Sequence, residues 1–225
     1  MLISLKRQIP AGATKKSNSA DSSILTTMNL AQQKHGDPHP AINAKIKSVM
    51  DAVVQQFIQS APFVVMATSN TSGDCDASPK GGKPGFVKVL DEKTLLLPDI
   101  AGNKLFQSYE NIESNPKAGL IFMIPGCGVT VRVNGRVSVI DQEAVKSLGV
   151  AGEVSQEVFG AISEEIFNPD EKAVTLQALR LEVDEVYPHC PRALKFSRLW
   201  DTEITRSNAN NQSDQYWYQQ WAKLS

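Results

Sequence analysis

Residues 63–98, FVVMATSNTSGDCDASPKGGKPGFVKVLDEKTLLLP, contain the clearest strand and turn signals of this 225-residue chain. Residues 63–69 are rich in β-branched and aromatic side chains, which is typical of a strand. The segment NTSGD that follows predicts a turn, because Gly73 can adopt a positive φ and Asn70 can bond its own backbone. Residues 86–98 then predict a hairpin around Asp-Glu-Lys. The pattern therefore predicts antiparallel β structure in this part of the chain.

Further strand-like runs occupy residues 118–125, 129–140 and 173–187, and Asn134-Gly135 predicts a bulge or a tight bend within the second of them. Apolar residues recur at helical spacing over residues 42–58, which predicts an amphipathic helix that packs on a core. Shorter helices are expected at residues 103–114, with Asn103 as the N-cap, and at 210–225. Short strands, glycine and proline turns and few long helices favour an antiparallel barrel.

Composition limits the classes of protein that remain. The net charge of -1 offers no argument for nucleic acid or membrane partners. No apolar run reaches the roughly 20 residues that span a bilayer, and no secretory h-region is present, so we expect a cytoplasmic protein. The cysteines Cys75, Cys127 and Cys190 are far apart, which predicts free thiols and no metal site. Residues 1–40 resemble a flexible N-terminal arm, followed by a single domain over residues 41–225.

Two short segments combine cations and glycines in a way that suits a phosphate group. Residues 78–83, SPKGGK, place a hydroxyl, two lysines and two glycines together, and glycines let backbone N–H groups approach an anion. Residues 97–104, LPDIAGNK, join a strand end to a helix start, where exposed N–H groups attract anions. Lys104 stands in that first turn, where a bound phosphate would offset its unfavourable interaction with the helix dipole. Taken alone, residues 78–83 could also be a polar turn with solvated lysines, and residues 97–104 could also be a capped helix with an exposed lysine.

Two other segments gather polar side chains. Thr130, Arg132 and Asn134 share one face of a strand by the period-two rule, and they could line a site or form the wet face of a barrel. Residues 189–200, HCPRALKFSRLW, combine cations with a tryptophan that could stack on a planar ring. The His-Cys pair that opens this segment lacks further ligands at metal spacing.

In this order, the motifs D-x-S-P-K-G, L-P-D-x-x-G-N-K, N-P-x-A-G-L-I-F and R-V-N-G resemble the flavin-binding split barrel of pyridoxamine 5'-phosphate oxidase-like proteins. The end HCPRALKFSRLWD resembles the C-terminal signature of one uncharacterised branch of that family. The similarity covers residues 42–202. It implies a mainly β (α+β) fold, a six-stranded antiparallel Greek-key split barrel with flanking helices and a C-terminal helical extension. It also implies a homodimer with two FMN molecules at the dimer interface.

Motif position implies which residues bind the cofactor. The FMN phosphate would contact Lys80 and Lys104, and the isoalloxazine ring would lie against the strands carrying residues 76–79 and 97–99. Residues from the C-terminal signature would reach toward the flavin of the partner subunit. The resemblance implies no metal and identifies no catalytic residue. The implied cofactor-binding residues are Asp76, Ser78, Pro79, Lys80, Pro98, Asp99, Asn103, Lys104, Asn111, Arg192, Lys195 and Trp200.

The chain departs from the branch pattern at two positions, because the branch has lysine where Arg192 stands and arginine where Phe196 stands. The substrate-phosphate residues of a true pyridoxamine 5'-phosphate oxidase are not found. The expected function is therefore that of an FMN-dependent oxidoreductase acting on an unidentified small molecule. The alternatives are a non-catalytic flavin-binding or flavin-handling protein, and a split barrel that binds the deazaflavin F420 or haem, with His189 as a haem ligand.

Overall fold

The computed structural model describes residues 33–37, 39–100, 105–141, 143–144 and 175–224. The chain divides after Asn43, and residues 44–225 form the unit that carries the β-sheet. The predicted arm over residues 1–40 and the region 145–174 thus lie largely or wholly outside the described residues.

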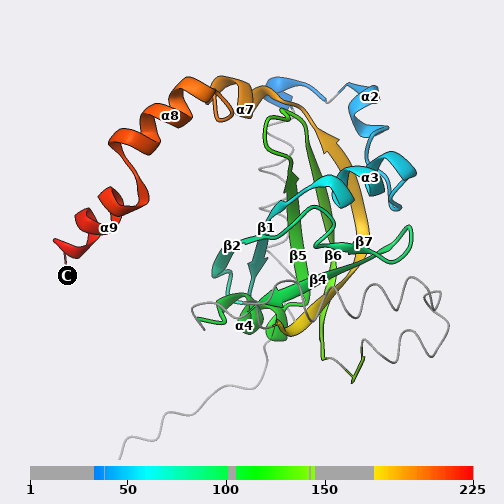
Figure 1. The fold of residues 1–225 in the computed structure, drawn as a ribbon. Coiled ribbons are helices and arrows are strands. Elements are labelled where there is room, and N and C mark those ends of the chain that lie inside the picture. Colours follow the sequence, from blue (N-terminus) through cyan, green and yellow to red (C-terminus); the bar gives the residue numbers. More distant parts are fainter. Residues whose placement is uncertain (1–32, 38, 101–104, 142, 145–174, 225) are drawn as a thin grey trace, which may run out of the picture. The chain divides into compact units, whose positions relative to one another are not determined.

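The described strands form one seven-stranded sheet in the order β2-β1-β5-β6-β7-β4-β3, and every pairing is antiparallel (Figure 1). The expected mainly β barrel with flanking helices is confirmed, but the strand number is seven rather than six because β3 adds a two-residue strand. The strands are β1 (Phe63–Ser69), β2 (Cys75–Gly81), β3 (Lys88–Val89), β4 (Thr94–Ile100), β5 (Lys117–Met123), β6 (Thr130–Ile140) and β7 (Thr175–His189). The described helices are α2 (Pro40–Asn43), α3 (Ala52–Ser60), α4 (Gln107–Ser114), α7 (Arg192–Phe196), α8 (Thr202–Asn211) and α9 (Asp214–Ala222).

The sheet curls around a single hydrophobic core. Alternate residues of five strands turn to one face and bury their side chains in the same cluster. Strands near both edges of the sheet contribute to this cluster, for example Val64 and Met66 of β1 and Leu95 and Leu97 of β4. Helix α3 adds Ile58, which is fully buried. A sheet that buries both of its ends in one core must close toward a barrel.

The predicted helix over residues 42–58 is wrong in its first half. Lys47 instead pairs with Val186 of β7 through two backbone hydrogen bonds, which removes it from any helix. Helix α3 begins only at Ala52, where the side chain of Asp51 accepts a hydrogen bond from the Val54 amide and caps the helix. Met50, Val54 and Ile58 of the apolar stripe are buried, whereas Ile46 and Val53 are exposed. The periodicity therefore identified part of the buried face but not the start of the helix.

A β-bulge lies where the sequence predicted one. The pairing of β6 with β7 shifts between Asn134 and Gly135, and Asp184 is the extra residue on β7. The bulge lets Val183 and Val186 both face the core although they are three residues apart. The Glu182 carbonyl oxygen lies only 2.1 Å from the position that a Gly135 Cβ would occupy, so this position requires glycine.

Each proline within a strand lies where one side of that strand has no partner. Pro79 belongs to β2, which is at an edge of the sheet. Pro98 lies beyond the part of β4 that pairs with β3, and Pro188 lies beyond the part of β7 that pairs with β4. Proline cannot donate to a ladder, so these positions fit the topology. The two open edges, β2 and the end of β4, bound a gap in the barrel that we call the split.

Candidate functional site

The split is bridged by an ion pair between the two edges. Asp76, Ser78 and Lys80 are half-buried on one face of β2, whereas the alternate residues of the strand are exposed. The Lys80 ammonium lies 3.1 Å from the Asp99 carboxylate of β4, and the two side chains are only 15% and 11% exposed. The residues that the resemblance implies on β2 and on β4 therefore meet at the split.

Helix α4 contributes a third set of polar groups, since it packs against β1 and β2. The buried Ser108 hydroxyl donates a hydrogen bond to the Asp76 carboxylate. The Asn111 amide donates to the Thr68 hydroxyl over 3.1 Å, and both side chains are buried. Asn111 thus belongs to the same polar cluster, but its amide nitrogen serves to join α4 to β1.

Tyr109 of α4 has a hydroxyl that is buried without a hydrogen-bond partner of good geometry. Burial raises the pKa of this hydroxyl above its ordinary value of 10.0, the neighbouring Asp99 carboxylate raises it further, and Gln177 acts in the opposite direction. The hydroxyl therefore stays protonated at neutral pH. It is a neutral donor beside the ion pair of the split.

The start of α4 differs from the prediction. The helix begins at Gln107, and its N-cap, Phe106, has a left-handed backbone with φ of 53°. A non-glycine residue in this conformation is strained by about 1–2 kcal/mol. Asn103 and Lys104, which the resemblance assigns to the phosphate, lie outside the described residues. The strain therefore falls two residues after Lys104, the last residue of the segment implied to hold an anion.

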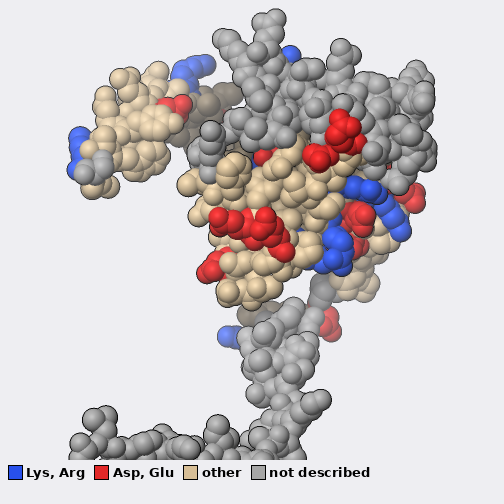
Figure 2. All heavy atoms as spheres, turned by 90° about the horizontal axis from the view of Figure 1, so that it is seen from below, with Lys and Arg blue, Asp and Glu red and all other residues tan. Residues whose placement is uncertain are grey.

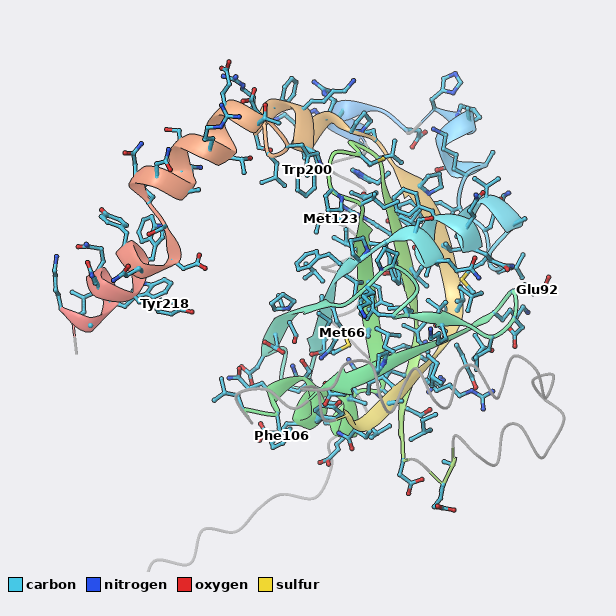
Figure 3. The ribbon with its side chains drawn as sticks, viewed as in Figure 1. Met66, Glu92, Phe106, Met123, Trp200 and Tyr218 are labelled. Atoms are coloured by element: carbon cyan, nitrogen blue, oxygen red, sulfur yellow. The ribbon has the colours of Figure 1, made fainter. Side chains whose placement is uncertain are left out.

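Helix α7, which carries Arg192 and Lys195, lies at the other end of the sheet from α4 (Figure 1), and Trp200 lies at the other end from Phe106 (Figure 3). His189, which ends β7 beside α7, is roughly 40 Å along the strand from Gln177, at about 3.3 Å per residue. The Trp200 indole donates a hydrogen bond to the Cys127 carbonyl oxygen over 2.9 Å. The structure therefore does not bring these three residues to the split of their own chain.

The outer face of the sheet, opposite the core, carries a pocket of about 570 Å³. Its floor is formed by small residues in register on three strands, because Ala67 pairs with Ala77 on one side and with Gly119 on the other. Asn134 of β6 lies directly beyond Gly119. The lining residues are Ala67, Thr68, Ser69, Cys75, Asp76, Ala77, Lys117, Ala118, Gly119, Asn134, Gly135 and Asp184. A volume of this size falls within the range of about 300–1,000 Å³ that is usual for ligand pockets.

Charge around these features is mixed. Among the described residues, the cluster at the split holds two carboxylates, Asp76 and Asp99, and one cation, Lys80. At the rim of the pocket, Lys117 and Asp184 form an exposed ion pair. On the face seen in Figure 2, the described basic side chains lie beside acidic ones rather than forming one continuous basic surface. No group of three or more potential metal ligands occurs in the described part of the chain.

Sequence reasoning missed several polar partners. Ser108, Thr68 and Tyr109 join the cluster at the split, and Glu185 binds the Asn134 side chain over 2.9 Å. The only available signal was the position of Ser108 and Asn111 on one face of the helix, three residues apart. The other contacts depend on which strands are neighbours, which sequence periodicity does not reveal.

An antiparallel barrel with a polar split between its edge strands has the architecture of a split-barrel protein. A family model described as pyridoxamine 5'-phosphate oxidase matches residues 50–190, which is more than half of the chain. The chain therefore belongs to the pyridoxamine 5'-phosphate oxidase family. No curated protein sequence matches it.

Solved structures with a similar fold include three proteins of different description. A protein related to general stress protein 26, from Clostridium acetobutylicum, has 14% identity, covers 60% of this chain and 83% of its own, and has a TM-score of 0.39. An FMN-binding protein from Syntrophomonas wolfei has 11% identity, covers 76% of this chain and 97% of its own, and has a TM-score of 0.38. HutZ, a haem storage protein from Vibrio cholerae, has 11% identity, covers 63% of this chain and 94% of its own, and has a TM-score of 0.37. Within the described residues, no helix is long and apolar enough to cross a membrane.

Proposed function

We propose that this protein binds FMN between two copies of the chain and acts as an FMN-dependent oxidoreductase on a small molecule. The phosphate lies at the split and the isoalloxazine ring lies in the outer-face pocket, so that the cofactor crosses the edge strand β2. The observation that supports this most directly is the Lys80–Asp99 ion pair, which joins β2 to β4 at an open edge of the barrel where α4 also packs against β2.

The phosphate is assigned to Lys80 and to the start of α4. A lysine ammonium has three donors, and only one of them is used by Asp99, so two remain for phosphate oxygens. The Tyr109 hydroxyl adds a neutral donor. Because the described cluster has one more carboxylate than cations, Lys104 is assigned the second positive charge.

The ring is assigned to the outer side of β2 rather than to β4. Pro98 and Asp99 are buried in the described structure, so they offer no surface for a ring. By contrast, Ala77 and Pro79 on β2 are exposed and face outward. The small side chains on the pocket floor leave a flat surface, and a planar ring can lie on it in close contact.

The second copy is assigned to the same outer face. Next to the pocket, this face carries apolar side chains that remain partly exposed, including Phe63 at 36%. Val65 pairs with Ile121 in the middle of this apolar area. Exposed apolar patches of this kind mark association surfaces. Covering the face would also enclose the pocket, and Ile121→Glu should convert the dimer to a monomer in light scattering while α3 and the core stay intact.

Binding of FMN and of riboflavin tests the phosphate assignment. Purified flavin-free protein should bind FMN, which a flavin absorption band and fluorescence quenching would report. Lys80→Met should weaken FMN binding by about tenfold or more, while riboflavin binding changes little, since a hydrogen bond to a charged group contributes about 1.5–3 kcal/mol. Lys83→Met is the matched control, because Lys83 is exposed three residues further on. If the wild-type protein does not bind FMN, the proposal is wrong, and equal losses of both flavins in Lys80→Met would refute the phosphate assignment.

A non-catalytic flavin-binding protein is the second candidate. The pocket lining contains no histidine. Its ionisable groups are Cys75, Asp76, Lys117 and Asp184; the Cys75 thiol donates to the Gly73 carbonyl oxygen, and the other three are engaged in hydrogen bonds or ion pairs. With no free acid or base in the pocket, any redox chemistry would have to come from the flavin itself. Stopped-flow mixing of the FMN complex with NADH or NADPH distinguishes the two functions. Rapid bleaching of the flavin supports an oxidoreductase, and a flavin that stays oxidised with both donors and with electron-transfer proteins supports the second candidate.

A further inference from the structure

We infer that Asn134 is the residue that selects the ring in the outer-face pocket, by presenting its carbonyl oxygen to an N–H donor on the edge of that ring. The inference rests on the proposed flavin function and extends it to a specific atom. The isoalloxazine has one such donor, N3–H, on its pyrimidine edge. Ligands that carry only acceptors or a methyl group at that place should bind less tightly.

The orientation of the Asn134 amide is set by its neighbour on β7. The Asn134 Nδ2 atom donates a hydrogen bond to the Glu185 carboxylate over 2.9 Å. An ionised carboxylate only accepts hydrogen bonds, so the nitrogen side of the amide must face Glu185. The carbonyl oxygen Oδ1 must then point the opposite way, toward β5 and the pocket.

The space that Oδ1 occupies is provided by Gly119. Oδ1 lies 3.0 Å from the position that a Gly119 Cβ would take, so the oxygen sits over the glycine at the pocket floor. Both residues line the pocket, and Ala67 and Ala77 continue the floor beyond them. No described residue donates a hydrogen bond to this oxygen. The pocket therefore contains an oriented acceptor whose natural partner is a donor from a ligand.

The test compares FMN with 3-methyl-FMN, which lacks the N3–H donor. Wild-type protein should bind FMN about two- to tenfold more tightly than the methylated analogue, which is the range that the net contribution of one hydrogen bond gives. Asn134→Leu keeps the size of the side chain but removes the acceptor, so it should bind FMN about as weakly as the analogue and lose the preference. Ser138→Ala is the matched control on the same strand and face, outside the pocket, and it should keep the preference.

Variants of Glu185 separate orientation from simple folding effects. Glu185→Leu should reduce the preference although Asn134 is still present, because the amide is then free to turn. Glu185→Gln keeps an acceptor for Nδ2 and should retain the preference. Asn134→Leu should lose as much affinity for riboflavin as for FMN. A disturbed phosphate site would instead weaken the binding of FMN alone, because riboflavin has no phosphate.

The outcomes are distinct for the two proposals. If wild-type protein binds no FMN, the proposed function fails and this inference fails with it. If wild-type protein binds FMN and 3-methyl-FMN equally well, only the role of Asn134 is overturned. This comparison needs no variant, so it decides the inference even if Asn134→Leu does not fold.

Discussion

The ion pair across the split can be tested by removing one partner. In flavin-free protein, Lys80→Met replaces the ammonium by an apolar group of similar length and leaves the Asp99 carboxylate without a cation. The Lys80 and Asp99 side chains are only 15% and 11% exposed, so water cannot fully replace the lost partner. At their separation of 3.1 Å, the attraction is about 5 kcal/mol for an effective dielectric constant of about 20.

The cost of desolvating both charges offsets much of that attraction, but the loss of one partner leaves the other charge uncompensated. We expect Lys80→Met to lower the free energy of unfolding by about 3–5 kcal/mol. The double variant Lys80→Met/Asp99→Asn should recover most of the loss, because no isolated charge remains. Urea unfolding followed by circular dichroism measures all three proteins and yields the coupling energy between the two positions.

The exposed ion pair of Lys117 and Asp184 provides the control. These side chains are 47% and 56% exposed, so Lys117→Met should lower the free energy of unfolding by less than about 1 kcal/mol. If Lys80→Met costs no more than Lys117→Met, the pair at the split is screened by solvent and the reasoning about burial is refuted. The split would then be open to water in the absence of a ligand.

Three further predictions concern stability. The pKa of Tyr109 is raised in the folded protein, so the protonated hydroxyl contributes fully to the free energy of unfolding below pH 10 and this contribution is lost as the pH rises from the unfolded pKa toward the folded one. In urea unfolding above pH 10, the wild type should therefore lose stability relative to Tyr109→Phe by up to about 1.4 kcal/mol per pH unit. A difference that stays constant with pH would contradict the shift. Gly135→Ala should lower the free energy of unfolding by about 3 kcal/mol or more, because the new Cβ atom would meet the Glu182 carbonyl oxygen. A change in melting temperature under 2 °C would exclude that contact. Asp51→Ala should lower the free energy of unfolding by about 1 kcal/mol through loss of the α3 cap, whereas Asp51→Asn, which can still cap the helix, should lower it less. Equal losses in the two variants would assign the effect to the ion pair with Lys47 instead.

Local features of the fold were predictable because short-range geometry determines them. Strand β1 has the predicted bounds, and the turn after it has Gly73 at a φ of 92°. The Asn70 side chain accepts hydrogen bonds from backbone amides within that turn, as expected. The bulge at Asn134-Gly135 also follows from a local sequence signal. In each case the residues that make the feature are neighbours along the chain.

Contacts between distant segments were not predictable in the same way. The pairing of Lys47 with Val186 shortened a helix that periodicity alone supported, because the strand competes for the same backbone groups. The Lys80–Asp99 pair and the Asn134–Glu185 hydrogen bond both depend on the sheet order. The motif resemblance placed Lys80 and Asp99 in one site without showing that they bind each other.

The proline in the edge strand also affects how copies of the chain can meet. An unpaired edge offers a row of donors and acceptors to which a strand of another molecule can add, which is a common route to aggregation. Pro79 lacks one of these donors in the middle of β2, so a continuous intermolecular ladder cannot form along this edge. This strand therefore disfavours open-ended, fibre-like growth, and the dimer proposed above would form through the face of the sheet, where the number of partners is limited.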